Sequence, residues 1–245
     1  MMIIPAIDLR GGQCVRLVQG KLEQETVYSK DPVFVAKLFQ AKGAQRLHII
    51  DLDGAFSGVV QNLEIIEKIC KEMTIPVQVG GGIRKMETID RVLAAGVSKV
   101  ILGTIAITDA PLLEEALKKY PGKIIVAIDA KNGLVAIDGW KDETQVKASD
   151  LAKKMKDSGV GEILYTDIMR DGMMEGPNLR GIKSLAKSCG IPIIAAGGIS
   201  TLQDVEKIYA LEKDGVEGMV IGKAIYTEGI KLEEAVKLVS GQAIN

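Results

Sequence analysis

The sequence predicts a protein of the α/β class, a closed (β/α)8 barrel that forms one domain over residues 1–245. Short apolar, β-branched runs alternate strictly with longer amphipathic segments, which is typical of parallel strands joined by helices. Eight such units in 245 residues match the size of this barrel. An internal repeat predicts two similar half-barrels, at about 1–121 and 122–245. A doubly wound open sheet is the alternative, although eight units would be many for one.

The strands are predicted where apolar residues follow one another without alternating with polar ones. Such runs are typical of strands that are buried on both faces. In chain order they are 2–7, 47–50, 76–79, 100–102, 124–128, 163–165, 192–195 and 218–221.

The helices are predicted between these strands. The first begins at Asp31, a capping residue that is followed by Pro32 at the first helical position, and it ends at Gly43. Ser200 and Gln203 predict a capping box at the start of the helix after the seventh strand. The remaining helices are expected at 63–73, 86–95, 110–119, 149–158, 179–188, 201–213 and 232–239.

Matching peptides carry the repeat. IPAIDLRGG at 4–12 matches IVAIDAKNG at 125–133, and the offset is 129 − 8 = 121. IPVQVGGGI at 75–83 matches IPIIAAGGI at 191–199, and the offset is 197 − 81 = 116. The smaller second offset predicts that the loop after the first strand is longer than the loop after the fifth. The long loop, 9–30, is therefore the candidate for a mobile lid.

Composition excludes several classes of function. The formal net charge is −1, and the 31 basic residues are scattered, which argues against a nucleic-acid or lipid surface. Three distant cysteines and one histidine make a zinc site improbable. The N-terminus lacks the basic region of a signal peptide, and no apolar run approaches the ~20 residues of a membrane span. We expect a cytoplasmic monomer that binds neither nucleic acid nor membranes.

Glycine-rich loops follow four of the predicted strands, and glycine lets the backbone N–H groups of a loop approach an anion closely. The candidate residues are Gly81, Gly82, Gly197 and Gly198 after the third and seventh strands, with Gly103, Thr104, Gly222 and Lys223 after the fourth and eighth. Loops after strands 7 and 8 of barrels frequently bind phosphate, so the repeat predicts two phosphate sites and a bisphosphate substrate. The alternative is that these glycines only make tight turns.

Arg84 occupies the position that matches Ser200 in the other half. Arginine has no oxygen to accept hydrogen bonds from a helix N-terminus, so a capping residue is lost there. We expect Arg84 to bind an anionic or carbonyl group, unless it is only an exposed side chain on a tolerant loop.

Asp8 and Asp129 are predicted at the mouths of the first and fifth strands, which lie on opposite sides of a barrel. Two carboxylates beside a phosphate-binding cleft suit general acid–base catalysis. The alternative is that each aspartate accepts hydrogen bonds from nearby loop amides. Thr166, Asp167 and Asp171 end the sixth strand, where some of the acids are expected only to fix loops.

Four further residues are open to two interpretations. Asp51 and Asp53 follow the second strand, where they either fix a loop or bind magnesium. His48 lies inside that strand, below the site, where it is expected to be a packing residue, with a catalytic residue as the alternative. Trp140 follows the fifth strand, where it either stacks on a planar ligand or anchors its loop.

The motifs IPAIDLRGGQCVRL, LHIIDLDGA, VGGGIR, AIDAKNG, DGW, TDIMRDG and AAGGIS, in this order, closely resemble a family of histidine biosynthesis. It is the family of phosphoribosylformimino-5-aminoimidazole carboxamide ribotide isomerases, and the resemblance covers essentially the whole chain. The cyclase subunit of imidazole glycerol phosphate synthase is similar to it in its half-barrel repeat. That sister family typically carries a cysteine near the first aspartate, whereas this strand reads Ala6-Ile7-Asp8.

The resemblance implies an Amadori rearrangement of a bisphosphate aminoaldose, without cofactor or metal. It implies that Asp8 is the general base and Asp129 the general acid, that Thr166 and Asp171 support the chemistry, and that Trp140 stacks on the substrate. Gly172, the last residue of TDIMRDG, is a further candidate for substrate binding. Because a carboxyl group ordinarily titrates near pH 4, we expect the protein to raise the pKa of Asp129.

Three other functions stay open. Some relatives also isomerise phosphoribosylanthranilate, and the same acid–base pair would serve both substrates. A cyclase would form an imidazole ring from ammonia and would bind a glutaminase partner. A non-catalytic barrel that only binds phosphorylated metabolites would not need the two aspartates.

Overall fold

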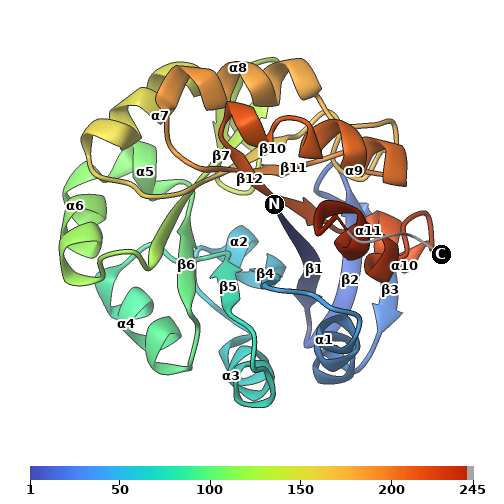
Figure 1. Cartoon of the computed structure of the whole chain (residues 1–245). Coiled ribbons are helices and arrows are strands. Elements are labelled where there is room, and N and C mark those ends of the chain that lie inside the picture. Colours follow the sequence, from blue (N-terminus) through green and yellow to red (C-terminus); the bar gives the residue numbers. More distant parts are fainter. Residues whose placement is uncertain (242–245) are drawn as a thin grey trace.

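The structure, a computed structural model that describes residues 1–241, is a closed (β/α)8 TIM barrel with helices around eight parallel strands (Figure 1). The strands follow one another around the barrel in chain order, and the last pairs with the first through Ile4 and Val220. They are Met2–Arg10 (β1), Leu47–Asp51 (β4), Val77–Gly80 (β5), Lys99–Leu102 (β6), Ile124–Lys131 (β7), Ile163–Asp167 (β10), Ile193–Ala196 (β11) and Val216–Ile221 (β12). The predicted fold class is confirmed, and the open-sheet alternative is wrong.

The outer helices lie where the amphipathic segments predicted them, within a few residues. They are Pro32–Ala41 (α1), Leu63–Glu72 (α3), Met86–Ala94 (α4), Ala110–Lys119 (α6), Ala148–Asp157 (α7), Leu179–Cys189 (α8), Leu202–Tyr209 (α9) and Leu232–Val239 (α11). Asp31 caps α1 as expected, because its carboxylate accepts a hydrogen bond from the Phe34 amide at 2.9 Å. The structure adds a 3-10 turn, Glu212–Asp214, and short helices at Leu52–Ser57 (α2), Ile105–Thr108 (α5) and Lys223–Tyr226 (α10).

The capping box of α9 lies one residue later than predicted. Thr201, not Ser200, is the capping residue, and its hydroxyl accepts from the Asp204 amide at 3.2 Å. The Asp204 carboxylate accepts in return from the Thr201 amide at 3.1 Å. Asp204 therefore takes the place in the capping box that was predicted for Gln203. Its carboxylate also accepts from the Ser200 hydroxyl at 2.9 Å.

The segment 9–30, predicted to be a loop, is instead mostly an antiparallel hairpin of Gln13–Val18 (β2) and Lys21–Ser29 (β3). A shorter hairpin of Leu134–Ile137 (β8) and Asp142–Lys147 (β9) follows β7. The barrel strands β1 and β7 continue beyond Asp8 and Asp129, because β2 pairs with the end of β1 and β8 with the end of β7. The apolar runs do not predict these hairpins, because each hairpin lies within a connection between a barrel strand and the following helix.

The barrel interior is filled by apolar side chains that point inward from the strands. They are Ile4, Ala6, Ile101, Ile125, Leu164, Ile194, Ala196 and Val220. A larger apolar cluster between the strands and the helices forms the main core. None of the helices within residues 1–241 is long and apolar enough to cross a membrane.

Candidate active site

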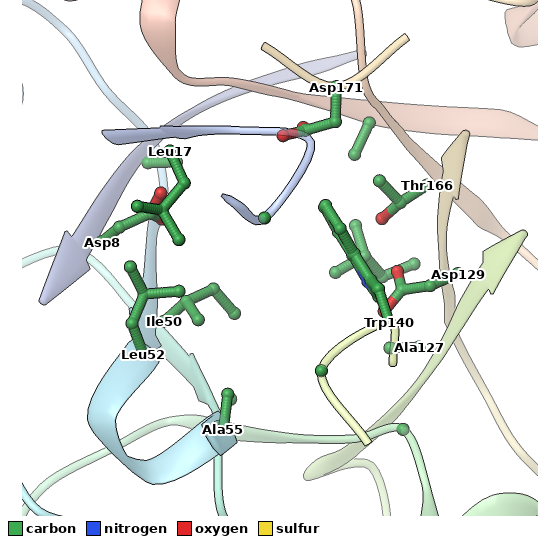
Figure 2. Close-up of a pocket in the computed structure, with 18 of the residues that line it drawn as sticks. Asp8, Leu17, Ile50, Leu52, Ala55, Ala127, Asp129, Trp140, Thr166 and Asp171 are labelled. Atoms are coloured by element: carbon green, nitrogen blue, oxygen red, sulfur yellow. The ribbon is translucent and has the colours of Figure 1, made fainter. Parts of the chain in front are cut away.

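A cavity of about 250 Å³ opens at the carboxyl ends of the barrel strands. Every residue that the sequence predicted for the site lines it. These residues are Asp8, Gly81, Gly82, Arg84, Gly103, Thr104, Asp129, Trp140, Thr166, Asp171, Gly172, Gly197, Gly198, Gly222 and Lys223. Figure 2 shows Asp8 on one side of this cavity and Asp129 on the other, with Asp171 and Thr166 above and beside them.

Asp8 is held on its side of the cavity by Arg16, a residue that the sequence did not single out. Arg16 Nη1 donates to Asp8 Oδ2 at 2.7 Å, and the Arg16 guanidinium also bonds to the Ala6 carbonyl and lies 5.2 Å from the centre of the Tyr226 ring. Burial raises the pKa of Asp8, and the charge of Arg16 opposes that rise. The only sequence signal was a basic residue in QCVRL, directly after the motif that carries Asp8.

Asp129 contacts different groups. The indole Nε1 of Trp140 donates to Asp129 Oδ2 at 2.9 Å, and Thr166 is the neighbour of Asp129 on the adjacent strand β10. Burial raises the pKa of Asp129, and hydrogen bonds from Trp140 and Thr166 oppose that rise. Trp140 has a left-handed backbone, with φ at +70°. A non-glycine residue in this region is uncommon, which supports a functional reason for the orientation of its side chain.

Asp171 is a further carboxyl group of the cavity and lies in the loop after β10. Burial, and then the negative charge of Asp8, raises its pKa to about 7. The loop is fixed from two sides, because Lys223 Nζ donates to the Gly172 carbonyl at 3.0 Å and the Gln19 amide donates to the Asp171 carbonyl at 3.3 Å. A pKa raised this far favours the protonated form of Asp171 more than in an exposed aspartate.

The paired glycines are required by local packing. Gly82 and Gly198 have positive φ, at +71° and +81°. A Cβ atom at Gly82 would lie 2.6 Å from the Gly54 carbonyl oxygen, and one at Gly198 would lie 2.5 Å from that of Gly176. The tight-turn interpretation thus explains why these residues are glycine, and a role in binding phosphate stays a proposal.

Arg84 forms an ion pair with Asp138, which follows β8, at 2.8 Å between Nη2 and Oδ1. The Asp138 amide donates to Thr104 Oγ1 at 3.1 Å. Three predicted site residues from three loops, Arg84, Thr104 and Trp140, are therefore linked through the β8–β9 connection. As expected, α4 has no side-chain cap: Lys85 occupies the capping position, and its side chain accepts no hydrogen bond from the helix N-terminus.

Asp51 fixes a loop. Its carboxylate accepts from the amides of Gly54, Gln61 and Asn62 and from the Asn62 side chain, at 2.6–2.9 Å. The Asp53 carboxylate accepts from the side-chain amide of Asn62 at 2.9 Å. Because these donors already occupy the oxygens, the loop-fixing interpretation accounts for both acids, and no group of three or more metal-binding side chains occurs within residues 1–241.

A closed barrel whose cavity lies between two partly buried carboxyl groups at strand ends defines a barrel enzyme suited to acid–base chemistry. The chain belongs to the histidine biosynthesis protein family, whose model matches residues 2–231.

Three relatives show how similar the chain is to individual members. Proteins from Trichlorobacter lovleyi and Geotalea daltonii are each 52% identical over 238 residues, 97% of both chains. A protein from a Geobacter species is 51% identical over 242 residues, which cover 99% of this chain and 100% of its own. All three are named as the 1-(5-phosphoribosyl)-5-((5-phosphoribosylamino)methylideneamino)imidazole-4-carboxamide isomerase.

Proposed function

We propose that this enzyme catalyses the isomerisation for which its relatives are named, and that the reaction is an Amadori rearrangement in which a phosphoribosyl aminoaldose becomes an aminoketose. The substrate named for them carries two phosphoribosyl groups and so has a phosphate at each end. The observation that carries the proposal is the position of Asp8 and Asp129 on opposite sides of one cavity. Glycine pairs lie beside it in both halves of the barrel, at 81–82 and 197–198.

The reaction needs a proton donor and a proton acceptor on the two faces of one sugar. A proton delivered to the ring oxygen opens the ribose and leaves a Schiff base at C1′. Removal of the C2′ proton then forms an enolamine, which tautomerises to the ketose with no net gain or loss of protons. Each transfer is fastest when the group has a pKa near the working pH.

The surroundings of the two aspartates support unequal roles. Asp8 is paired with the Arg16 cation, which favours its carboxylate form and suits a base. Within residues 1–241 no such cation is paired with Asp129, and burial is the main influence on its pKa, so it suits the acid. Asp171 is a second candidate for the acid, because its pKa of about 7 keeps a proton available at neutral pH.

The two phosphates are proposed to bind at opposite ends of the cavity. Gly81, Gly82, Gly103 and Thr104 would bind one, and Gly197, Gly198, Gly222 and Lys223 the other. Arg84 would turn from Asp138 to the substrate, and Trp140 would stack on the imidazole. The protein would act as a monomer. It would need no cofactor or metal, since proton transfers alone complete the reaction.

Turnover of the purified full-length protein tests the proposal. We expect conversion of the imidazole-carboxamide aminoaldose, and a loss of about 10²- to 10⁴-fold in kcat in Asp8→Asn and in Asp129→Asn. Tight substrate binding without turnover would instead support a non-catalytic binding protein. Turnover of phosphoribosylanthranilate in a parallel assay would support dual specificity. Ring formation that requires ammonia would support a cyclase.

A further inference from the structure

A chain of hydrogen bonds between buried polar side chains runs through the barrel beneath the cavity. Arg46 Nη1 donates to Glu162 Oε1 at 2.8 Å and to Gln78 Oε1 at 3.1 Å. Gln78 Nε2 lies 2.9 Å from His48 Nδ1. These four side chains are buried in a barrel whose other interior residues are mainly apolar. A buried polar group that lacks a hydrogen-bond partner costs free energy of folding. The donor and acceptor roles in one of these hydrogen bonds therefore constrain the roles in the next.

These hydrogen bonds determine which nitrogen of His48 carries the proton. Arginine can only donate hydrogen bonds, so Gln78 must present its oxygen to Arg46 and its amide nitrogen to His48. An amide nitrogen also only donates, so Nδ1 of His48 must be the acceptor. A neutral imidazole carries one proton, which is therefore on Nε2.

The Nε2–H group is available to a ligand. His48 lines the cavity, and no group within residues 1–241 forms a hydrogen bond with its Nε2. His48 pairs with Ala6 in register, whereas Asp8 pairs with Ile50, so the imidazole lies one layer beneath Asp8. Burial, and then the charge of Arg16, lowers the pKa of His48 to about 3, and the ring stays neutral at ordinary pH.

We propose that His48 binds the substrate from the floor of the cavity, where its Nε2–H donates a hydrogen bond to an oxygen of the sugar. Gln78 and Arg46 are positioning residues that hold His48 in this tautomer. The proposal rests on the proposed function, because a sugar between Asp8 and Asp129 would lie directly above the ring. A ligand without an acceptor there would leave the buried donor unpaired, so His48 would also contribute to specificity.

Nitrogen NMR of the full-length protein tests the tautomer directly, because His48 is the only histidine in the sequence and gives one imidazole signal pair. We expect a protonated Nε2 and an unprotonated Nδ1 that do not titrate between about pH 5 and 8. Gln78→Glu should move the proton to Nδ1, because a carboxylate accepts rather than donates. A proton on Nδ1 in the unaltered protein would overturn the proposal, whether or not the protein is an isomerase.

The contact with substrate is tested in the Asp8→Asn background, which slows turnover. Saturation with the aminoaldose should shift the Nε2–H proton resonance, and an unchanged resonance with bound substrate would exclude the contact.

Two matched substitutions test its contribution to turnover. The amide nitrogen of glutamine in His48→Gln replaces Nε2, whereas that of asparagine in His48→Asn reaches only the Nδ1 position. We expect kcat/KM to fall about tenfold or more in His48→Asn and only a few-fold in His48→Gln. Equal kcat/KM in both folded variants would count against the donor role. An inactive unaltered enzyme would refute the proposed function, while the tautomer spectrum would still decide this inference.

Discussion

The indole nitrogen of Trp140 donates a hydrogen bond to Asp129 Oδ2 at 2.9 Å. A donor to a carboxylate favours its ionised form, so Trp140 opposes the burial that raises the pKa of Asp129. The same indole lies against Gly20 at the tip of the β2–β3 hairpin, where a Cβ atom would be 2.9 Å from the ring. Trp140 thus connects the proposed acid to the hairpin that follows the proposed base, and movement of the indole onto a substrate would break both contacts.

Trp140→Phe should shift the basic limb of the pH profile of kcat/KM to higher pH, by roughly 0.5–1 unit. Removing the N–H donor raises the pKa of Asp129 further, so a protonated acid would persist to higher pH. The ring of phenylalanine keeps most of the contact with Gly20. An unmoved basic limb would mean that the ionisation of Asp129 does not limit the reaction.

Arg16→Met should shift the acidic limb of the same profile to higher pH. Arg16 lowers the pKa of Asp8, and without its charge this partly buried carboxyl group gains its proton at a higher pH. A base must be unprotonated, so activity should disappear sooner as the pH falls. The measurement is kcat/KM against pH, with Arg10→Met as a control because Arg10 pairs with Glu25. A profile like that of the control would argue against Asp8 as the base.

Asp171→Asn should stabilise the protein at pH 8 more than at pH 4. The folded pKa of Asp171, about 7, lies above its ordinary value of 3.8, so ionisation destabilises the folded state. This destabilisation is absent below about pH 4, grows between about pH 4 and 7, and is complete above that range. Thermal unfolding at several pH values measures it. A Tm difference between variant and unaltered protein that does not grow with pH would contradict the raised pKa.

Gly82→Ala should destabilise the protein by more than Gly122→Ala. Both glycines have nearly the same φ, +71° and +73°, so the substitutions share the backbone strain. Only at Gly82 would the new methyl group clash, 2.6 Å from the Gly54 carbonyl oxygen, whereas nothing lies within 4 Å at Gly122. We expect about 1–3 kcal/mol of additional loss at Gly82 in denaturant unfolding. Equal losses would show that the loop rearranges freely.

Much of the fold was predictable because its signals are local. Apolar runs, capping residues such as Asp31, and repeated peptides are contained in short stretches of chain. The half-barrel repeat stays a prediction, supported by two hairpins in matching places and by the pairs Asp51–Asn62 and Asp167–Asn178, which have the same spacing. The residues of the site could be predicted because strand ends of one barrel meet at one mouth.

By itself, the sequence determined the barrel and the set of residues around its cavity, since both follow from periodicity and position along the chain. Only the tertiary structure decided their partners: Arg16 for Asp8, Trp140 for Asp129, and the chain of hydrogen bonds from Arg46 to His48. Arg46 and Glu162 are 116 residues apart and meet only because the sheet closes. Such contacts depend on side-chain directions across the closed barrel, and these are not encoded in any short segment.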